Sequence, residues 1–129
     1  MNKKHPDVFK IVLPRVNAKL HAHNTGHWKG KASAVRELRR IAWQATRSDL
    51  NQYKDFEPWD HATVEYYFDV PDLRRRDAAN MIQSQKAAID GISDAGLIVD
   101  DDWKHLEIAG VNCRLNREDP KVSLVFRKV

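Results

Sequence analysis

The sequence has little of what stabilises small secreted domains. Its single cysteine, Cys113, excludes an intramolecular disulfide framework and a cysteine-rich zinc site, and we expect it to be buried or half-buried. Glycine and proline contribute five residues each of 129, too few for a collagen-like or low-complexity chain. No run approaches the roughly 18 consecutive apolar residues of a membrane span. The apolar run 8–13 is interrupted by Lys10 and precedes no small-residue cleavage site, which predicts a cytoplasmic protein without a membrane partner.

The composition that is present is that of an ordinary globular chain, with 42% apolar and 31% charged residues. The length predicts one domain over 1–129, which buries about two-thirds of the surface of the unfolded chain. The net charge of +4 permits nucleic-acid binding without demonstrating it. Arginines gather at 74–76 and carboxylates at 100–102. This distribution indicates a polyanionic partner together with a cation site.

Hydrophobic periodicity predicts the secondary structure. Alternating residues predict strands at about 7–13, 61–70, 104–111 and 121–128. Helical spacing predicts one helix from Ser33 to about Asp49 and another from Ala78 to Asp94, with Gly96 as its stop. Residues 14–30 are expected to form a long loop. The order β-α-β-α-β-β predicts an α+β (α/β-like) domain, in which two helices pack on a small mixed sheet.

The second predicted helix separates apolar from polar residues. On a helical wheel the core face is expected to carry Met81, Ala88, Ile89 and Ile92. The opposite face is expected to carry Asn80, Gln83, Ala87, Asp90 and Asp94, with Lys86 at its edge. Arg74, Arg75 and Arg76 lead into the helix N-terminus, where backbone N–H groups favour a phosphate.

Carboxylates precede, occupy and follow this helix. Asp77 stands at its start, Asp90 within it, and Asp100 and Asp101 in the acidic turn beyond, so folding of the helix against the turn is expected to bring them together. Carboxylate oxygens and water are the ligands of Mg²⁺ and Mn²⁺. In phosphodiester hydrolysis such a metal generates the hydroxide, and a lysine such as Lys86 stabilises the growing negative charge. The inventory is typical of a nuclease.

Each of these features also has a purely structural interpretation, which spacing alone leaves open. Asp77 is a suitable N-cap with Asn80 as its capping-box partner, a contribution of about 1 kcal/mol. Lys86 and Asp90 are spaced for a surface ion pair of about 0.3–0.5 kcal/mol. The runs 74–76 and 100–102 are compatible with solvated surface.

The predicted loop 14–30 carries a second set of candidate DNA contacts. There, Trp28 is suited to stack on an unpaired base beside His27, while Lys29 and Lys31 are suited to contact phosphates. The alternative is that Trp28 packs beneath the loop and His27 caps nearby backbone. Both interpretations stay open.

Three segments carry a resemblance to a known family. Residues 75–80 (RRDAAN), 86–91 (KAAIDG) and 94–102 (DAGLIVDDD) resemble the signature of the RusA family of Holliday junction resolvases, endodeoxyribonucleases common in phages and prophages. The N-terminal part, including His27 and Trp28, is similar to phage members, so the resemblance covers nearly the whole chain. It implies a RusA-like fold and a homodimer that uses Mg²⁺, or alternatively Mn²⁺, to nick opposing strands of a four-way DNA junction. It also implies the cytoplasm of a bacterium or of a phage-infected cell.

The resemblance implies roles for individual residues. Asp77 and Asp101 would be metal ligands, Asp100 would assist, and Lys86 would be the catalytic lysine. The family pattern is Asp-x-Asp-Asn with the lysine three residues after the Asn, whereas here position 79 is alanine and Lys86 follows Asn80 by six residues. Either Asn80 supplies the missing oxygen, or three residues are inserted and Asn80 aligns with an aspartate. The departure leaves two alternatives open: a branched-DNA-binding protein with weak or no catalysis, and a basic protein-interaction module.

Overall fold

The structure is a computed structural model of the chain and describes residues 4–14 and 28–129; of Trp28 and Lys29 it describes the backbone. The elements, in chain order, are β1 (Val8–Pro14), α1 (Trp28–Leu50), β2 (Ala62–Val70), α2 (Ala78–Gln83), α3 (Lys86–Asp94), β3 (Leu106–Leu115) and β4 (Lys121–Lys128). The α+β fold and the approximate positions of the four predicted strands are confirmed. None of the described helices is both long enough and apolar enough to span a membrane.

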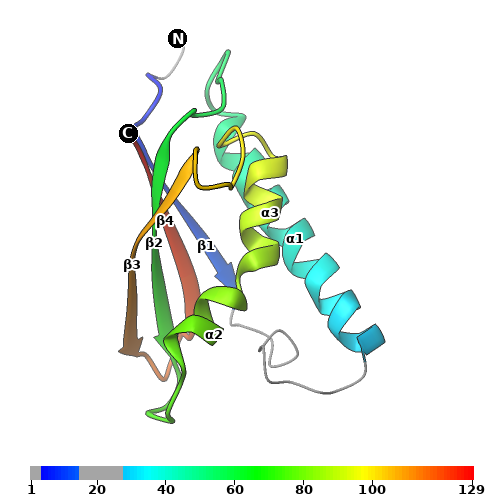
Figure 1. Cartoon of the computed structure of the whole chain (residues 1–129), viewed down its shortest axis with the longest axis vertical. Coiled ribbons are helices and arrows are strands. Elements are labelled where there is room, and N and C mark those ends of the chain that lie inside the picture. The colour runs from blue at the N-terminus through cyan, green and yellow to red at the C-terminus, as the bar shows by residue number, and fades with distance from the viewer. Residues whose placement is uncertain (1–3, 15–27) are drawn as a thin grey trace.

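The strands form one mixed sheet in the order β1-β4-β2-β3. β4 runs antiparallel to both of its neighbours, whereas β2 and β3 are parallel, with a register irregularity between Val64 and Glu65. The helices lie on one side of this sheet, as Figure 1 shows. In this strand order β1 and β3 are the edge strands, and β3 lies farther than β1 from the long helix α1.

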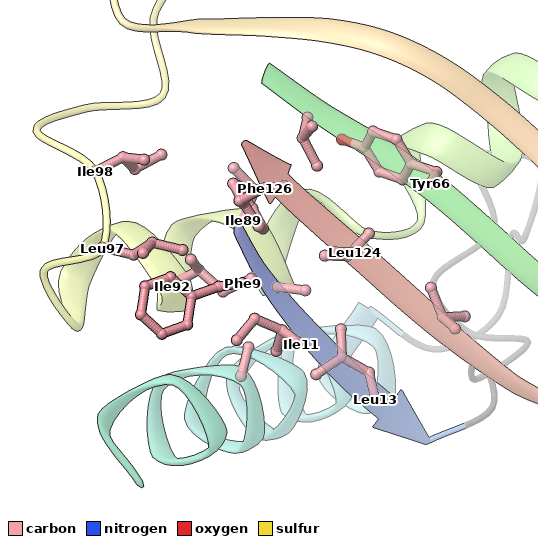
Figure 2. Packing of buried hydrophobic residues seen from close by; sticks show 14 of the residues in the cluster. Phe9, Ile11, Leu13, Tyr66, Ile89, Ile92, Leu97, Ile98, Leu124 and Phe126 are labelled. Atoms are coloured by element: carbon pink, nitrogen blue, oxygen red, sulfur yellow. The ribbon is translucent and has the colours of Figure 1, made fainter. Parts of the chain in front are cut away.

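The residues of β2 alternate between its two faces. Ala62, Val64, Tyr66, Phe68 and Val70 are all buried toward the helices. They join residues of the other strands, of α3 and of the segment after α3 in one core, part of which is drawn in Figure 2: Phe9, Ile11, Leu13, Ile89, Ile92, Leu97, Ile98, Leu124 and Phe126. Burial of each large apolar side chain contributes about 1.5–3 kcal/mol, so this core anchors α3 and the segment that follows it.

The helix predicted over 78–94 is interrupted. α2 ends at Gln83 and α3 begins at Lys86, with Ser84 and the almost fully buried Gln85 between them. The Ser84 hydroxyl donates to the carbonyl oxygen of Met81 at 2.6 Å, a local bond of the kind by which serine competes with helical geometry. One continuous wheel is therefore wrong for this segment: Ala87 is buried and does not belong to the polar face. Gly96, at φ +96°, follows the end of α3 as predicted.

The first helix is longer than predicted. α1 begins at Trp28, so residues 28–30 are helical and do not belong to the predicted loop. It packs against α3 at Gly91, where an added Cβ would lie 2.2 Å from the carbonyl oxygen of Arg39. Absence of a side chain thus lets the two helix backbones touch. The expectation for Cys113 is also wrong, since this residue is exposed on β3.

Candidate functional site

The ammonium group of Lys86 is the centre of a charged cluster beside the sheet. Its Nζ lies 2.6 Å from Oδ1 of Asp90 and 2.5 Å from Oδ2 of Asp101. Lys86 is the first residue of α3 and Asp90 lies one turn further along, so the helix itself brings these two together. Asp101 comes from the acidic turn. We call these three residues the Lys86 cluster.

Two backbone hydrogen bonds to Trp59 fix the chain between α3 and the acidic turn, and so place Asp101 in the cluster. Trp59 N–H donates to the carbonyl oxygen of Leu97 at 2.9 Å, and Val99 N–H donates to that of Trp59 at 3.0 Å. Leu97 and Ile98 are fully buried beneath these bonds. Within the turn, Oδ1 of Asp100 accepts the backbone N–H of Asp101 at 2.7 Å, so Asp100 orients its neighbour.

The charges of the cluster stabilise one another. The hydrogen bond from Lys86 lowers the pKa of Asp101 below its ordinary value, against the effect of partial burial. Hydrogen bonds to Asp101 first, and then to Asp90, raise the pKa of Lys86. Lys86 is therefore a cation and Asp101 an anion throughout the neutral pH range.

Tyr66 is a neighbour of this cluster that the sequence analysis did not single out. Burial raises the pKa of its hydroxyl to about 12, while Lys86 lowers and Asp101 raises that value through their charges. The hydroxyl therefore stays protonated and neutral at the buried side of the cluster. Only its position on the inner face of β2, next to α3, reveals this neighbourhood (Figure 2).

A hollow of about 190 Å³ adjoins the cluster between α1 and the α2–α3 segment. Its lining comprises Lys31, Val35, Gln83, Ser84, Lys86, Ala87 and Asp90. Lys31, a predicted phosphate contact, thus shares a hollow with Lys86 and Asp90. Of the other candidates in this region, His27 lies outside the described residues, and Trp28 and Lys29 are placed only as the start of the α1 backbone.

Asp77 has the capping role that was one of its two interpretations. Its Oδ1 accepts the backbone N–H groups of Ala79 at 2.9 Å and Asn80 at 3.2 Å, at the N-terminus of α2. Among the residues that the structure describes, no hydrogen bond or ion pair joins Asp77 to the Lys86 cluster. Asp90, Asp100, Asp101 and Lys86 are thus brought together, whereas Asp77 and the half-buried Asn80 belong to the separate helix α2.

The three consecutive arginines differ in their surroundings. Arg76 donates to Oδ1 of Asp72 at 2.9 Å and to the carbonyl oxygens of Asp72 and Arg74, and its side chain is mostly buried. Arg74 makes a longer contact with Asp72, at 3.5 Å, and is largely exposed. Arg75 is exposed as well. Arg76 therefore shapes the loop before α2, and Arg74 and Arg75 project their charge to solvent.

The carboxylates of the cluster fit a hard cation that keeps water ligands. In residues 4–14 and the chain from 28 onward, no group of three or more His, Cys, Asp or Glu side chains is arranged to hold a metal ion. Mg²⁺, however, retains several waters and is commonly held by only one or two carboxylates. Asp90 and Asp101 supply such a pair of oxygen ligands, and oxygen ligands favour Mg²⁺ or Mn²⁺ over zinc.

Comparison with models of known protein families gives no match, and no curated protein matches the sequence. The resemblance to the RusA family therefore stays a prediction from the motifs.

Proposed function

We propose that the protein is a Mg²⁺-dependent, structure-specific endodeoxyribonuclease that resolves four-way DNA junctions by paired phosphodiester hydrolysis. The supporting observation is the Lys86 ammonium between the carboxylates of Asp90 and Asp101. Anionic oxygen ligands and an adjacent cation are the two kinds of group that phosphodiester hydrolysis needs, one to hold a metal and one to offset charge on the phosphate.

Each residue of the cluster has a defined task in this proposal. Asp101 and Asp90 hold the metal, and Asp100 orients Asp101 through the backbone bond. A Mg²⁺ ion held by these carboxylates would supply a nucleophilic water and positive charge for the reacting phosphate oxygens. Lys86 has an exposed, flexible side chain, so its ammonium can exchange a carboxylate for a phosphate oxygen as negative charge grows there.

The DNA partner and the homodimer are part of the same proposal. Lys31 lines the hollow beside the cluster, and the exposed Arg74 and Arg75 precede α2, so positive side chains are available at both places. Phosphate contacts from such residues position a nucleic acid without reading its sequence. Because two opposing strands must be cut, we propose a two-fold symmetric dimer that presents two equivalent sites.

A second candidate function is the binding of branched DNA without efficient cleavage. The observation in its favour is the capping role of Asp77, whose Oδ1 already accepts two backbone N–H groups. Position 79, where the RusA pattern has a second aspartate, is alanine. A site that relies on Asp90 and Asp101 alone would bind Mg²⁺ weakly.

A cleavage assay separates the two candidates. The protein is incubated with Mg²⁺ and either a synthetic four-way junction or a linear duplex of the same sequence. We expect symmetric paired nicks in the junction only, abolished in Asp101→Asn with junction binding retained. Asp102→Asn is the matched control, because Asp102 is an exposed neighbour outside the Lys86 cluster. Binding without cleavage in both Mg²⁺ and Mn²⁺ would support the second candidate, and absence of both would refute both.

A further inference from the structure

A second hollow, of about 320 Å³, lies between β3 and the segment that leads into α2. Its apolar walls are formed by Leu73, Met81, Val111 and Leu115. Three arginines, Arg74, Arg76 and Arg114, also line it. We call this feature the β3 groove. It is separate from the Lys86 cluster, with which it shares no lining residue.

The β3 groove exists because β3 is an edge strand that the long helices do not cover. Val111, Cys113 and Leu115 pair with Tyr66, Phe68 and Val70 of β2 and so share their face of the sheet. Those β2 residues are buried, whereas Leu115 is 41% exposed and Leu73 across the groove is 78% exposed. Large apolar side chains that remain exposed around one hollow are typical of a binding surface.

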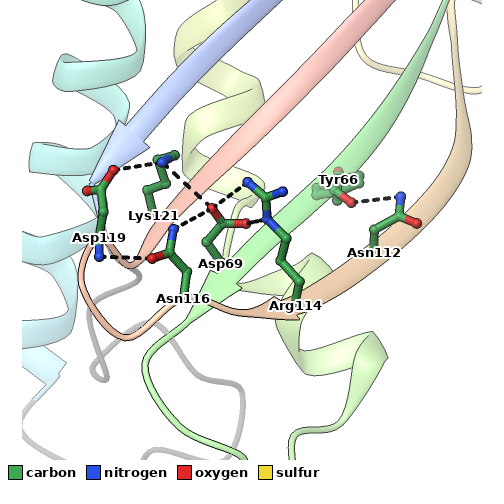
Figure 3. Close-up of polar contacts among 7 residues, drawn as sticks. All are labelled: Tyr66, Asp69, Asn112, Arg114, Asn116, Asp119 and Lys121. Carbon is green, nitrogen blue, oxygen red and sulfur yellow. Dashed lines mark hydrogen bonds and ion pairs between the residues drawn. The ribbon is translucent and has the colours of Figure 1, made fainter.

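The arginines of the groove are held in place by carboxylates. Arg114 forms a bidentate pair with Asp69, at 2.7 Å from Nε and 3.0 Å from the terminal nitrogen (Figure 3). This pair lies on the open face of the sheet, because Asp69 and Arg114 alternate with Val70 and Leu115. On the groove side, Arg76 is fixed by Asp72. A guanidinium whose N–H edge is engaged by a carboxylate still offers its flat face, on which planar rings stack. Arg74 and Arg114 are both largely exposed, but Arg114 is paired with Asp69 on the opposite face of the sheet, so Arg74 is the exposed cation on the groove side.

These surroundings suit a planar ring that carries one negative group. The ring would pack on Leu73, Leu115 and a guanidinium face, and the negative group would meet Arg74. A nucleotide whose base is unpaired has this chemistry, whereas the bases of duplex DNA are stacked inside the helix and present no free face. An acidic peptide suits the groove less well, because Asp72 already occupies the N–H edge of Arg76, which leaves Arg74 as the one exposed cation of the groove side.

We propose that the β3 groove binds one unpaired nucleotide of a DNA strand, with its base against the apolar walls and its phosphate at Arg74. The inference rests on the proposed function, in that the strand is taken to belong to the same branched DNA, from which binding would draw one base out of its pair. It adds a base-binding site next to α2 that neither the motifs nor the Lys86 cluster assigns.

The only thiol of the chain reports directly on this site. Cys113 is exposed and lines the groove, so a bound nucleotide should shield it from a thiol reagent such as Ellman's reagent. The full-length protein is titrated with a fluorescent single-stranded oligodeoxynucleotide, and binding is followed by anisotropy. When the free oligonucleotide concentration is about ten times the dissociation constant, roughly a tenth of the protein remains unbound. We therefore expect the rate of Cys113 modification to fall about tenfold.

Two matched comparisons identify what shields Cys113. An oligonucleotide of equal length and charge with abasic sites throughout should shield it much less, since it brings the phosphates without the bases. Arg74→Glu should reduce the shielding. Lys54→Glu reverses a positive charge in the same way, but Lys54 is exposed before the end of β2 opposite the groove, so this control should leave the shielding unchanged.

Several results would overturn the inference. One is that the rate of Cys113 modification stays unchanged although anisotropy shows that the protein is saturated with oligonucleotide. Equal shielding by the abasic strand, or stronger shielding by a polyglutamate peptide, would also exclude a bound base. If the oligonucleotide does not bind at low salt, the inference fails too. Junction cleavage that persists in any of these cases leaves the proposed function standing, so the two failures can be told apart.

Discussion

Asp69 lies on the open face of the sheet, where Arg114, Asn116 and Lys121 surround its carboxylate. Its side chain is 4% exposed and lies 2.7 and 3.0 Å from two nitrogens of Arg114, 3.1 Å from Asn116 and 3.7 Å from Lys121 (Figure 3). The Arg114 hydrogen bonds, against the opposing effect of burial, lower the pKa of Asp69 from 3.8 to about 2.

This shift makes the free energy of unfolding depend on pH. Because the pKa of Asp69 is lower in the folded chain, the unfolded chain binds the proton first as the pH falls. The ionised carboxylate therefore contributes its full share of stability above about pH 5, and this share is lost as the pH falls toward 2. A shift of this size corresponds to about 2 kcal/mol, of which about half is lost by pH 3.

Urea unfolding of the wild type and of Asp69→Asn measures this contribution. At about pH 6 we expect the variant to be less stable by about 2 kcal/mol, and at about pH 3 we expect the difference to shrink by about 1 kcal/mol. Asp119→Asn is the control, because Asp119 is exposed and its ion pair with Lys121 is worth at most about 1 kcal/mol. A difference between wild type and Asp69→Asn that does not change with pH would refute the electrostatic explanation.

Three further predictions test other parts of the structure. Gly91→Ala would place a Cβ 2.2 Å from the carbonyl oxygen of Arg39, so we expect a loss of about 3 kcal/mol or more in urea unfolding; a stable variant would show that α1 and α3 do not touch there. Asp77→Ala removes the cap of α2 and should cost about 1 kcal/mol in thermal unfolding, whereas an unchanged melting temperature would contradict the capping role. Lys86→Gln should slow junction cleavage by about a hundredfold or more in single-turnover assays, with binding nearly unchanged; wild-type cleavage would remove Lys86 from the mechanism.

The elements that the sequence predicted well are those with a strong local period or a specific residue at a turn. The alternation from Ala62 to Val70 identifies both the strand and its buried face, because side chains of a strand point alternately to its two sides. Gly96 marks the end of α3 because its positive φ is easily reached only without a Cβ. The break at Ser84 and Gln85 had no comparable signal, since both residues are compatible with a continuous helix.

For the candidate site, the sequence motifs alone identify Lys86, Asp90 and Asp101 as candidate residues. That Asp101 reaches Lys86 depends on the pairing of Trp59 with the segment after α3, which links two distant parts of the chain. For Asp77 the sequence left two roles open, and the backbone geometry at the start of α2 shows the capping one.

The sequence by itself determined which segments become strands and helices and which residue types are available for chemistry, because these follow from local periodicity and side-chain character. Only the tertiary structure decided the pairing of Asp69 with Arg114, since this requires the parallel register of β2 and β3 after their irregularity. It likewise decided that β3 is an edge strand, which leaves the β3 groove and Cys113 exposed. Strand order and register arise from the packing of the whole chain, so no local pattern carries them.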